Sequence, residues 1–372
     1  MAIQSGTKAY RIVGIGEAPT GTGGEVSEME DLLHRVAATI ATYRQGEIEA
    51  PTAQHVDRWL RQFTPENQLP FLREFSSVMG HIFVTRAWTI EFLRRLIGNQ
   101  ELSGPNPAQY WGAANILQIQ SVGRSQQEMV RLLGESLMHG YGLDVLRCGH
   151  PDGDFIYLDD GIFSGSRAIA DLGEWIRTQA PAHANLQIIV IALHIGGFYW
   201  VKDNLQRVAR ESGKNIIIKF WKVYDIENRR TYKNSSNVLW PATVPNSQEA
   251  QAYVDSIAST RFPLEMRAAG APRWPFVSEE GRQILEGEFL IAGAKIKANM
   301  VEEKSYFRPL GFGSFGAGFG TMMVTYRNCP NNAPLALWWG DGGVSTPALN
   351  WYPLFKRRTN SSLENIFDDL TR

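Results

Sequence analysis

The sequence predicts an α/β protein with a doubly wound parallel sheet, a helical unit before the sheet, and an aromatic, glycine-rich extension after it. Strand and helix patterns alternate between residues 106 and 244, and repeated β-α units of this kind build parallel sheets. Helical periodicity extends over residues 25–105. The composition changes near residue 245, where tryptophan, phenylalanine and glycine become frequent.

The chain of 372 residues is long enough for two or three structural units. We expect a strand at residues 10–13 and a glycine-rich linker at residues 21–24 in the first segment. The four expected segments are residues 1–24, 25–105, 106–244 and 245–372.

The helical unit contains an apolar face and a predicted helix start. Val56, Trp59, Leu60 and Phe63 recur at helical spacing. The run Thr-Pro-Glu at 64–66 combines a hydroxyl cap, an early proline and an acid, which predicts the start of the next helix. This unit is expected to pack internally or to bind a partner. A helix-turn-helix that reads DNA stays open, although no basic recognition helix stands out.

The α/β core is predicted from alternating apolar strands and amphipathic helices. The predicted strands are residues 116–120, 155–158, 188–193 and 216–221. The predicted helices are residues 126–139, 167–178 and 200–211.

Two adjacent carboxylates follow the second core strand. Asp159 and Asp160 come directly after the apolar residues 155–158, and a turn of small residues leads into the next helix. Because ligands of parallel sheets bind at the carboxyl ends of strands, the pair is expected at the ligand edge. Backbone N–H groups of such a turn can face a phosphate. Two alternatives stay open: the acids cap the following helix, or the site is that of another nucleotide-binding or phosphoacceptor fold.

This stretch, residues 158–166, resembles the phosphoribosyl diphosphate (PRPP) motif of type I phosphoribosyltransferases. The resemblance implies that Asp159 and Asp160 bind the ribose hydroxyls and Mg²⁺, directly or through water. It implies a second group, which binds the 5′-phosphate: Ser164, Gly165, Ser166 and Arg167. Arg167 stands where a threonine is more usual, but its guanidinium fork suits a phosphate.

A second loop is expected at the same edge. Gly123 and Arg124 follow the first core strand and precede the helix at 126–139. In the family this loop binds the pyrophosphate of PRPP, so the resemblance implies that role for both residues. A plain strand-to-helix turn with a surface arginine stays open. Residues 140–154 are too short for the strand pair and lid that type I enzymes usually carry.

The extension contains two further distinctive segments, Arg-Pro-Leu-Gly at 308–311 and Tyr-Arg-Asn-Cys-Pro-Asn-Asn at 326–332. With the acidic motif, they resemble bacterial phosphoribosyltransferase-like domains with a C-terminal extension, which occur in anti-phage conflict systems. Related proteins act as effectors beside retron reverse transcriptases. The resemblance implies a defence-system protein or a nucleic acid as partner.

Two more residues are weaker candidates. His194 follows the strand at 188–193, on the expected ligand edge, where it is either a general base or a structural histidine. Arg327 follows a predicted strand at 321–326 and is available to an anion, with aromatic scaffolding as the alternative reading of its surroundings.

These features leave two classes of function open. The first is an enzyme that transfers ribose from PRPP or cleaves a nucleotide at its N-glycosidic bond. The second is a catalytically inactive PRPP or nucleotide sensor, or a scaffold, that acts through a protein or nucleic-acid partner.

Composition limits the cellular compartment and the partners that we expect. A net charge of −1 provides no overall attraction to nucleic acid. Two distant cysteines, Cys148 and Cys329, exclude a disulfide scaffold and fit a reducing compartment. The longest apolar run is far shorter than a membrane span, and the first residues lack a signal-peptide pattern. We therefore expect a cytoplasmic protein with no membrane contact.

Overall fold

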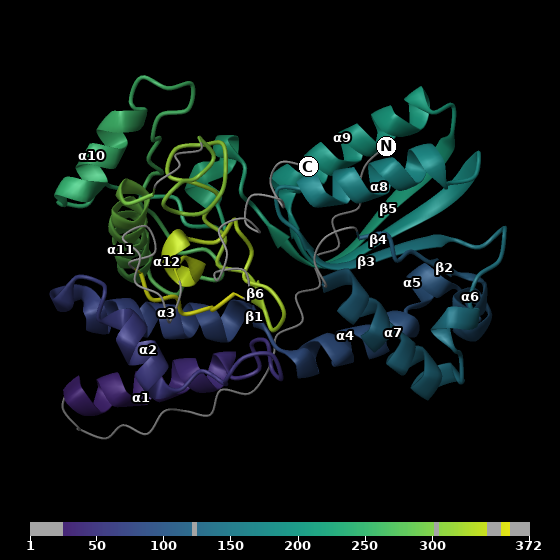
Figure 1. Ribbon diagram of the computed structural model, residues 1–372, viewed down its shortest axis with the longest axis horizontal. Helices are drawn as coiled ribbons and strands as arrows, with labels where there is room; N and C mark the ends of the chain where they lie inside the picture. The colour runs from purple at the N-terminus through teal and green to yellow at the C-terminus, as the bar shows by residue number, and fades with distance from the viewer. Residues whose placement is uncertain (1–24, 121–124, 301–304, 341–350, 358–372) are drawn as a thin grey trace.

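The computed structural model describes residues 25–120, 125–300, 305–340 and 351–357. Within these ranges the chain forms a mixed α/β structure with two parallel sheets (Figure 1). The strand predicted at 10–13 and the linker at 21–24 lie outside the described residues.

The helices and strands have the following bounds. The helices before the main sheet are α1 (Glu25–Ile40), α2 (Ala53–Leu60), α3 (Gln68–Ile82), α4 (Arg86–Ile97), α5 (Gln100–Ser103) and α6 (Pro107–Ala113). The strands are β1 (Phe83–Val84), β2 (Asn115–Ile116), β3 (Phe155–Ile162), β4 (His183–His194), β5 (Asn215–Ile226) and β6 (Val324–Thr325). The helices between and after the sheet strands are α7 (Ser125–Tyr141), α8 (Ser166–Thr178), α9 (Ile195–Glu211), α10 (Gln248–Ile257), α11 (Glu279–Ala298) and α12 (Leu335–Trp338). Short 3-10 helices are η1 (Pro65–Asn67), η2 (Val145–Arg147) and η3 (Arg230–Ser235).

The main sheet has the strand order β2-β3-β4-β5, and every neighbouring pair is parallel. Successive side chains of β3 belong to different buried clusters. Ile156 and Leu158 pack in the cluster that contains α7, whereas Tyr157 packs in the cluster that contains α8 and α9. Helices therefore cover both faces of the sheet (Figure 1), and the predicted α/β class with a parallel sheet is confirmed.

The three longer strands extend beyond their predicted ends. The apolar runs end at residues 158, 193 and 221, but the strands continue to Ile162, His194 and Ile226. In β3, the ladder with β4 carries the backbone through both aspartates to Ile162. In β5, an edge strand, burial alternates along the chain, so polar residues occupy its exposed positions without ending it.

The first core strand is shorter than predicted. The predicted strand covered residues 116–120, whereas β2 spans only Asn115–Ile116. The backbone N–H groups of Ile119 and Gln120 donate instead to the side-chain oxygen of Gln126, at 3.0 and 2.9 Å. Gln126 is 1% exposed, so a buried side chain from α7 replaces the strand ladder at this point.

The helix start predicted at Thr64 is also different in the structure. Residues 65–67 form η1, and α3 begins only at Gln68. The Thr64 side chain caps nothing; its backbone N–H donates to Glu288 Oε2 at 3.0 Å. Thr52 provides a hydroxyl cap for α2, because its side chain accepts from the backbone N–H of His55.

The N-terminal helices and the C-terminal extension share one aromatic core. The Trp59 indole N–H donates to the Ala336 carbonyl at 2.8 Å, and rings from α2, the turn after it, α3 and α11 contact one another. These rings belong to Trp59, Phe63, Phe71, Phe75 and Phe289. The short strands β1 and β6 pair in parallel. Figure 1 accordingly shows α3 beside α11 and α12.

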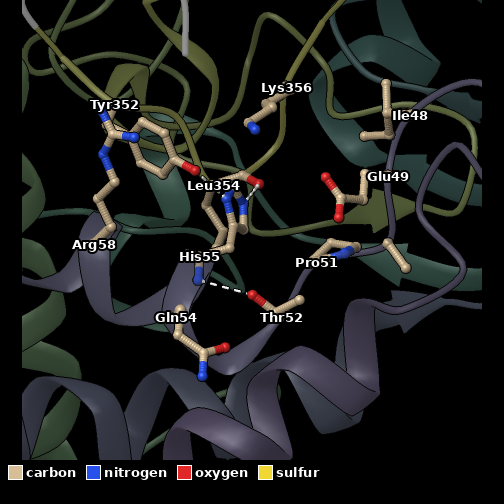
Figure 2. A pocket seen from close by; sticks show the side chains of 11 residues that line it. Ile48, Glu49, Pro51, Thr52, Gln54, His55, Arg58, Tyr352, Leu354 and Lys356 are labelled. Atoms are coloured by element: carbon tan, nitrogen blue, oxygen red, sulfur yellow. Dashed lines mark hydrogen bonds between the residues drawn. The ribbon is translucent and has the colours of Figure 1, made fainter. Parts of the chain in front are cut away.

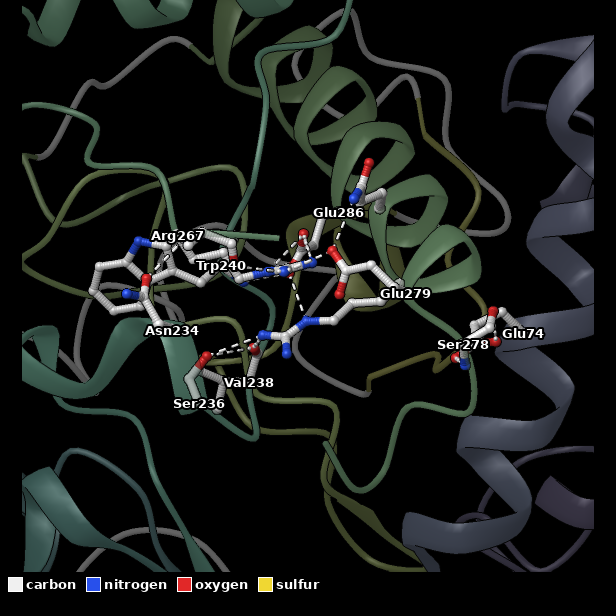
Figure 3. A network of polar contacts seen from close by, with 12 residues as sticks. Glu74, Asn234, Ser236, Val238, Trp240, Arg267, Ser278, Glu279 and Glu286 are labelled. Carbon is white, nitrogen blue, oxygen red and sulfur yellow. Dashed lines mark hydrogen bonds and ion pairs between the residues drawn. The ribbon is translucent and has the colours of Figure 1, made fainter. Parts of the chain in front are cut away.

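A buried ionic network holds α11 against residues 236–240 and against Arg267 (Figure 3). Glu286 Oε1 accepts from Arg282 Nε at 2.9 Å and from the Trp240 backbone N–H at 3.0 Å. Glu286 Oε2 accepts from Arg267 Nη2 at 2.9 Å. The three charged side chains are each 1% exposed. Their remaining hydrogen bonds go to Glu279, Ser236 and the backbone, so the buried charges are compensated.

The Glu286→Gln change keeps the side-chain shape and removes the charge between Arg267 and Arg282. Because removing one partner of a buried ionic group costs about 3–5 kcal/mol, we expect the free energy of unfolding to fall by about that amount. Denaturant unfolding measures the loss. The matched Glu211→Gln change, in an exposed pair with Arg207, should cost less than about 1 kcal/mol. Equal losses in the two variants would contradict this account of the network.

Candidate functional site

The acidic pair lies inside β3, before the strand ends. Asp159 pairs in register with Val190 of β4, and β3 continues to Ile162. The pair is still near the carboxyl end of the strand, where ligands of parallel sheets bind. Both side chains are buried, with exposed fractions of 6% for Asp159 and 5% for Asp160.

Each carboxylate has its own hydrogen-bond donors. The Tyr157 hydroxyl donates to Asp159 Oδ2 at 3.2 Å, and the Asp160 backbone N–H donates to Asp159 Oδ1 at 2.9 Å. The Thr325 hydroxyl donates to Asp160 Oδ2 at 3.0 Å. Asp159 is therefore held mainly by its own strand, whereas Asp160 is held by a strand of the C-terminal extension.

Burial raises the pKa of both carboxyls. For Asp159 the desolvation of the charged form is the main cause, opposed by hydrogen bonds from the Asp160 N–H and Ser125. For Asp160, desolvation and the neighbouring Asp159 charge raise the pKa to about 8. Two adjacent buried carboxyls resist holding two negative charges. The pair thus favours either a shared proton or a bound cation.

The turn after the pair is packed tightly against α9. Gly165 has φ +88°, and a Cβ built there would lie 2.5 Å from Val201 Cγ2. A Cβ on Gly197, in the first turn of α9, would lie 2.0 Å from the Phe163 carbonyl oxygen. Glycine at both positions allows this close approach. The turn is therefore held in a fixed position beside the acidic strand.

The start of α8 presents backbone donors at this turn. Gly165 occupies the cap position and provides no side-chain cap, so the first N–H groups of α8 have no capping acceptor from that residue. Ser164 and Ser166 are exposed, and their hydroxyls lie 3.3 Å apart. Arg167 is close enough to Tyr157 for its charge to lower the pKa of that hydroxyl, which burial raises. This arrangement has the donors that a phosphate requires.

The remaining sequence candidates are placed differently. Gly123 and Arg124 lie outside the described residues. Ser125, the first residue of α7, is near enough to Asp159 to affect its pKa. Residues 142–154 contain η2 and loop in place of a strand pair. The start of α7 therefore reaches the acidic pair, but the pyrophosphate-loop prediction stays a prediction.

His194 is enclosed in the protein. Its exposed fraction is 0%. Nδ1 lies 3.0 Å from the Ile162 carbonyl oxygen and Nε2 lies 2.9 Å from Thr321 Oγ1. Burial lowers the histidine pKa to about 3, and the rings of Phe163 and Phe319 contact the imidazole. These contacts favour the structural role over the general base.

Arg327 is bound to the N-terminal part of the chain. Its Nη1 lies 2.6 Å from Glu47 Oε1, and both side chains are 17% exposed. The arginine follows Thr325, which contacts Asp160, by two residues. Its observed partner is a carboxylate.

Sequence reasoning missed Tyr157 and Thr325. Tyr157 precedes Asp159 by two residues, so it projects from the same side of the strand, and this spacing could have identified it. Thr325 meets Asp160 across 165 residues of sequence. A single threonine in a short apolar strand carries no signal for such a contact.

A cavity of about 270 Å³ lies elsewhere, between the start of α2 and residues 352–356 (Figure 2). The His55 imidazole Nδ1 lies 2.6 Å from the Tyr352 hydroxyl. The guanidinium of Arg58 is 4.0 Å from the centroid of the Tyr352 ring, and Lys356 also lines the cavity. None of the sequence candidates contributes to its lining.

The fold and site define an α/β protein with a buried acidic pair and an uncapped helix start at the ligand edge of a parallel sheet. The family model PRTase-CE matches residues 56–357, and the chain belongs to this family of phosphoribosyltransferase-like domains. Comparisons with curated proteins and with solved structures found no match. No described helix has both the length and the apolar character that a membrane span requires.

The Gly165→Ala change tests the packing of the turn. A left-handed alanine costs about 1–2 kcal/mol, and the contact with Val201 adds about 1–3 kcal/mol of overpacking. Gly213→Ala is the matched control, because φ there is +66° and a Cβ would meet nothing within 4 Å. We expect Gly165→Ala to lower the free energy of unfolding more than the control does. Equal losses would contradict close packing against α9.

The raised pKa of Asp160 predicts a pH dependence of stability. An unfolded aspartate releases its proton near pH 4, whereas folded Asp160 keeps it up to a pKa of about 8. Between these two pH values the carboxyl of Asp160 is protonated in the folded state and ionised in the unfolded state. The free energy of unfolding therefore falls as the pH rises through this window.

The Asp160→Asn change should reduce the decrease in the free energy of unfolding between pH 5 and pH 8, which denaturant unfolding at the two pH values measures. Asp154→Asn is the control, because Asp154 lies just before β3, where it accepts from Tyr110 and Gln187. If the free energy of unfolding of Asp160→Asn decreased as much between the two pH values as that of the wild type, the raised pKa would be contradicted.

Proposed function

We propose that this protein binds PRPP or a nucleotide, together with Mg²⁺, at the carboxyl edge of β3. The observation that carries the proposal is the buried pair of Asp159 and Asp160 followed directly by a fixed turn and the uncapped start of α8. Carboxylates suit ribose hydroxyls and cations, and the helix start suits a phosphate. One compact ligand contains all of these groups.

The chemistry of the acidic pair fits Mg²⁺ when a phosphorylated ligand is present. Among the described residues, no group of three or more histidine, cysteine, aspartate or glutamate side chains could hold a metal. Mg²⁺ usually takes one or two carboxylates together with substrate phosphates and water. Asp159 and Asp160 provide such a pair, and a divalent charge offsets the repulsion that raises their pKa values.

Under this proposal the residues have distinct roles. Asp159 and Asp160 orient the ribose hydroxyls, while the N–H groups of 164–167 and the Arg167 guanidinium bind the 5′-phosphate. In an enzyme these groups would stabilise a sugar that gains positive charge as its leaving group departs, with Mg²⁺ neutralising the charge of a departing pyrophosphate. Ribosyl transfer and N-glycosidic cleavage both use this arrangement.

A PRPP or nucleotide sensor is the second candidate function. Two observations favour it: residues 142–154 contain no described strand pair, and Thr325 of the extension donates to Asp160. The first leaves the reaction without the usual lid against water. The second links the ligand site to the extension, through which ligand binding would reach a protein or nucleic-acid partner.

We further propose that the protein is a cytoplasmic effector or component of a bacterial anti-phage system, related to retron effectors. The resemblance of the acidic motif and of residues 308–311 and 326–332 to domains of anti-phage conflict systems supports this setting. Phage plating on cells with the wild-type gene or with the Asp159→Asn, Asp160→Asn variant tests it. Protection that requires both aspartates supports the role, and equal plating on both strains with an empty-vector control overturns it.

Calorimetric titration of PRPP and common nucleotides with Mg²⁺ tests ligand binding. We expect the Asp159→Asn, Asp160→Asn variant to bind at least about tenfold more weakly, because each lost charge-assisted hydrogen bond contributes about 1.5–3 kcal/mol. Asp154→Asn changes a carboxylate at the other end of the strand and should bind as the wild type does. Circular dichroism verifies that the variants are folded.

Product formation then separates the two functions. Turnover of a bound ligand that the double variant abolishes identifies an enzyme. Binding without turnover identifies a sensor. If the folded wild type binds none of these ligands, the ligand-site proposal is wrong.

A further inference from the structure

Several buried polar atoms without partners gather where residues 42–44 approach the segment that follows β6. They are Thr42 Oγ1, the Tyr43 hydroxyl, Arg44 Nε and Nη1, and Arg327 Nε, none of which has a hydrogen-bond partner among the described residues. Buried polar groups in folded proteins are nearly always paired. A cluster of unpaired ones therefore requires an explanation.

The backbone here is held in an uncommon conformation. Arg44 has φ +47°, and among the described residues it is the single non-glycine residue with a positive φ. Its N–H donates to the Tyr326 carbonyl at 2.6 Å, and the Arg327–Glu47 ion pair fixes the far side of the same turn. Left-handed backbone at a long side chain is costly and tends to persist at functional positions.

Arg327 is paired with Glu47, but neither Arg44 nor Arg357 forms an ion pair with a described residue; the Arg357 guanidinium lies 3.8 Å from the centroid of the Trp338 ring. Arg357 donates to the Asn331 side-chain oxygen and to the Cys329 carbonyl, which are both neutral acceptors. Arg44 forms no ion pair with a described residue, and its Nε and Nη1 have no acceptor there. The two guanidinium groups are close enough for the charge of Arg44 to lower the pKa of Arg357, which burial also lowers. Both arginines are half-buried as residues, but the unpaired Nε and Nη1 atoms of Arg44 are buried, and like charges that are partly removed from water are unfavourable without a counterion.

Tyr43 lies within the same group. It is 1% exposed, and the charges of both Arg44 and Arg357 act on its hydroxyl, whose pKa burial raises. Ordered water could pair with this hydroxyl, but water cannot balance two guanidinium charges. Guanidinium groups donate and never accept. The missing partner is therefore an anion with several acceptor oxygens.

We propose that Tyr43, Arg44 and Arg357 form a binding site for a phosphate group, with Thr42 and Arg327 at its margin. Arginine forks match the geometry of phosphate oxygens, and a tyrosine hydroxyl adds a third donor. The phosphate is either free in solution or part of a nucleotide. The site does not depend on ligand binding at Asp159 and Asp160.

Titration calorimetry with inorganic phosphate, at constant ionic strength in chloride buffer, tests the site. We expect the wild type to bind phosphate and Arg44→Gln to bind it at least about tenfold more weakly, a difference of about 1.4 kcal/mol. Arg94→Gln, at an exposed arginine of α4, should leave the affinity unchanged. Titration with AMP identifies the source of the phosphate: tighter binding than inorganic phosphate indicates a nucleotide, and equal binding indicates free phosphate.

Thermal unfolding provides a readout that a merely structural arginine would not produce. Phosphate should raise the melting temperature of the wild type by mass action and leave that of Arg44→Gln unchanged. Without phosphate, Arg44→Gln should be at least as stable as the wild type, since it removes an uncompensated charge. Tyr43→Phe deletes only the hydroxyl and supplies a second variant should Arg44→Gln fail to fold; we expect it to weaken phosphate binding.

Two outcomes would overturn the proposal. The first is a wild type that does not distinguish phosphate from chloride. The second is phosphate binding that Arg44→Gln and Tyr43→Phe both retain; if the Asp159→Asn, Asp160→Asn variant then loses it, the phosphate binds at the acidic edge of β3.

Discussion

The burial of β3 on both faces is the constraint on which the rest of the structure depends. One face packs against α8 and α9, and the other packs against α7 and the core shared with the extension. The strand continues through Asp159 and Asp160, so two carboxyls enter a desolvated interior. The same burial that stabilises the sheet raises the pKa values of this pair.

The C-terminal extension is part of the structure around the site. Thr325 of β6 donates to Asp160, while β6 pairs with β1 between α3 and α4. Trp59 of α2 donates to Ala336, and the ion pairs of Glu286 with Arg267 and Arg282 hold α11 in place. Because these interactions join distant parts of the chain, the acidic pair keeps its surroundings only when the extension is folded.

An acidic and a basic side chain lie close to the same end of β6. Asp160 meets Thr325, the last residue of this short strand, and the Arg44 backbone N–H donates to the carbonyl of Tyr326, the next residue. Neither Asp160 nor Arg44 has a described ion-pair partner, so the charged form of each side chain is unfavourable where it is removed from water. Such conflicts between local stability and charge are typical of functional positions. They explain why strained backbone and raised pKa values occur near the same strand.

The sequence by itself determined the α/β class, the helical character of residues 25–105 and the adjacency of the acids and the small-residue turn. These follow from periodicity and from covalent order, which are local. Tertiary structure alone decided that β3 continues through the acids, that Gln126 replaces the ladder beyond β2, and that His194 is enclosed by Ile162 and Thr321. It also brought Thr325 to Asp160 and Arg44 to Arg357. These contacts join segments far apart in the chain, and their energies depend on burial, which no local pattern specifies.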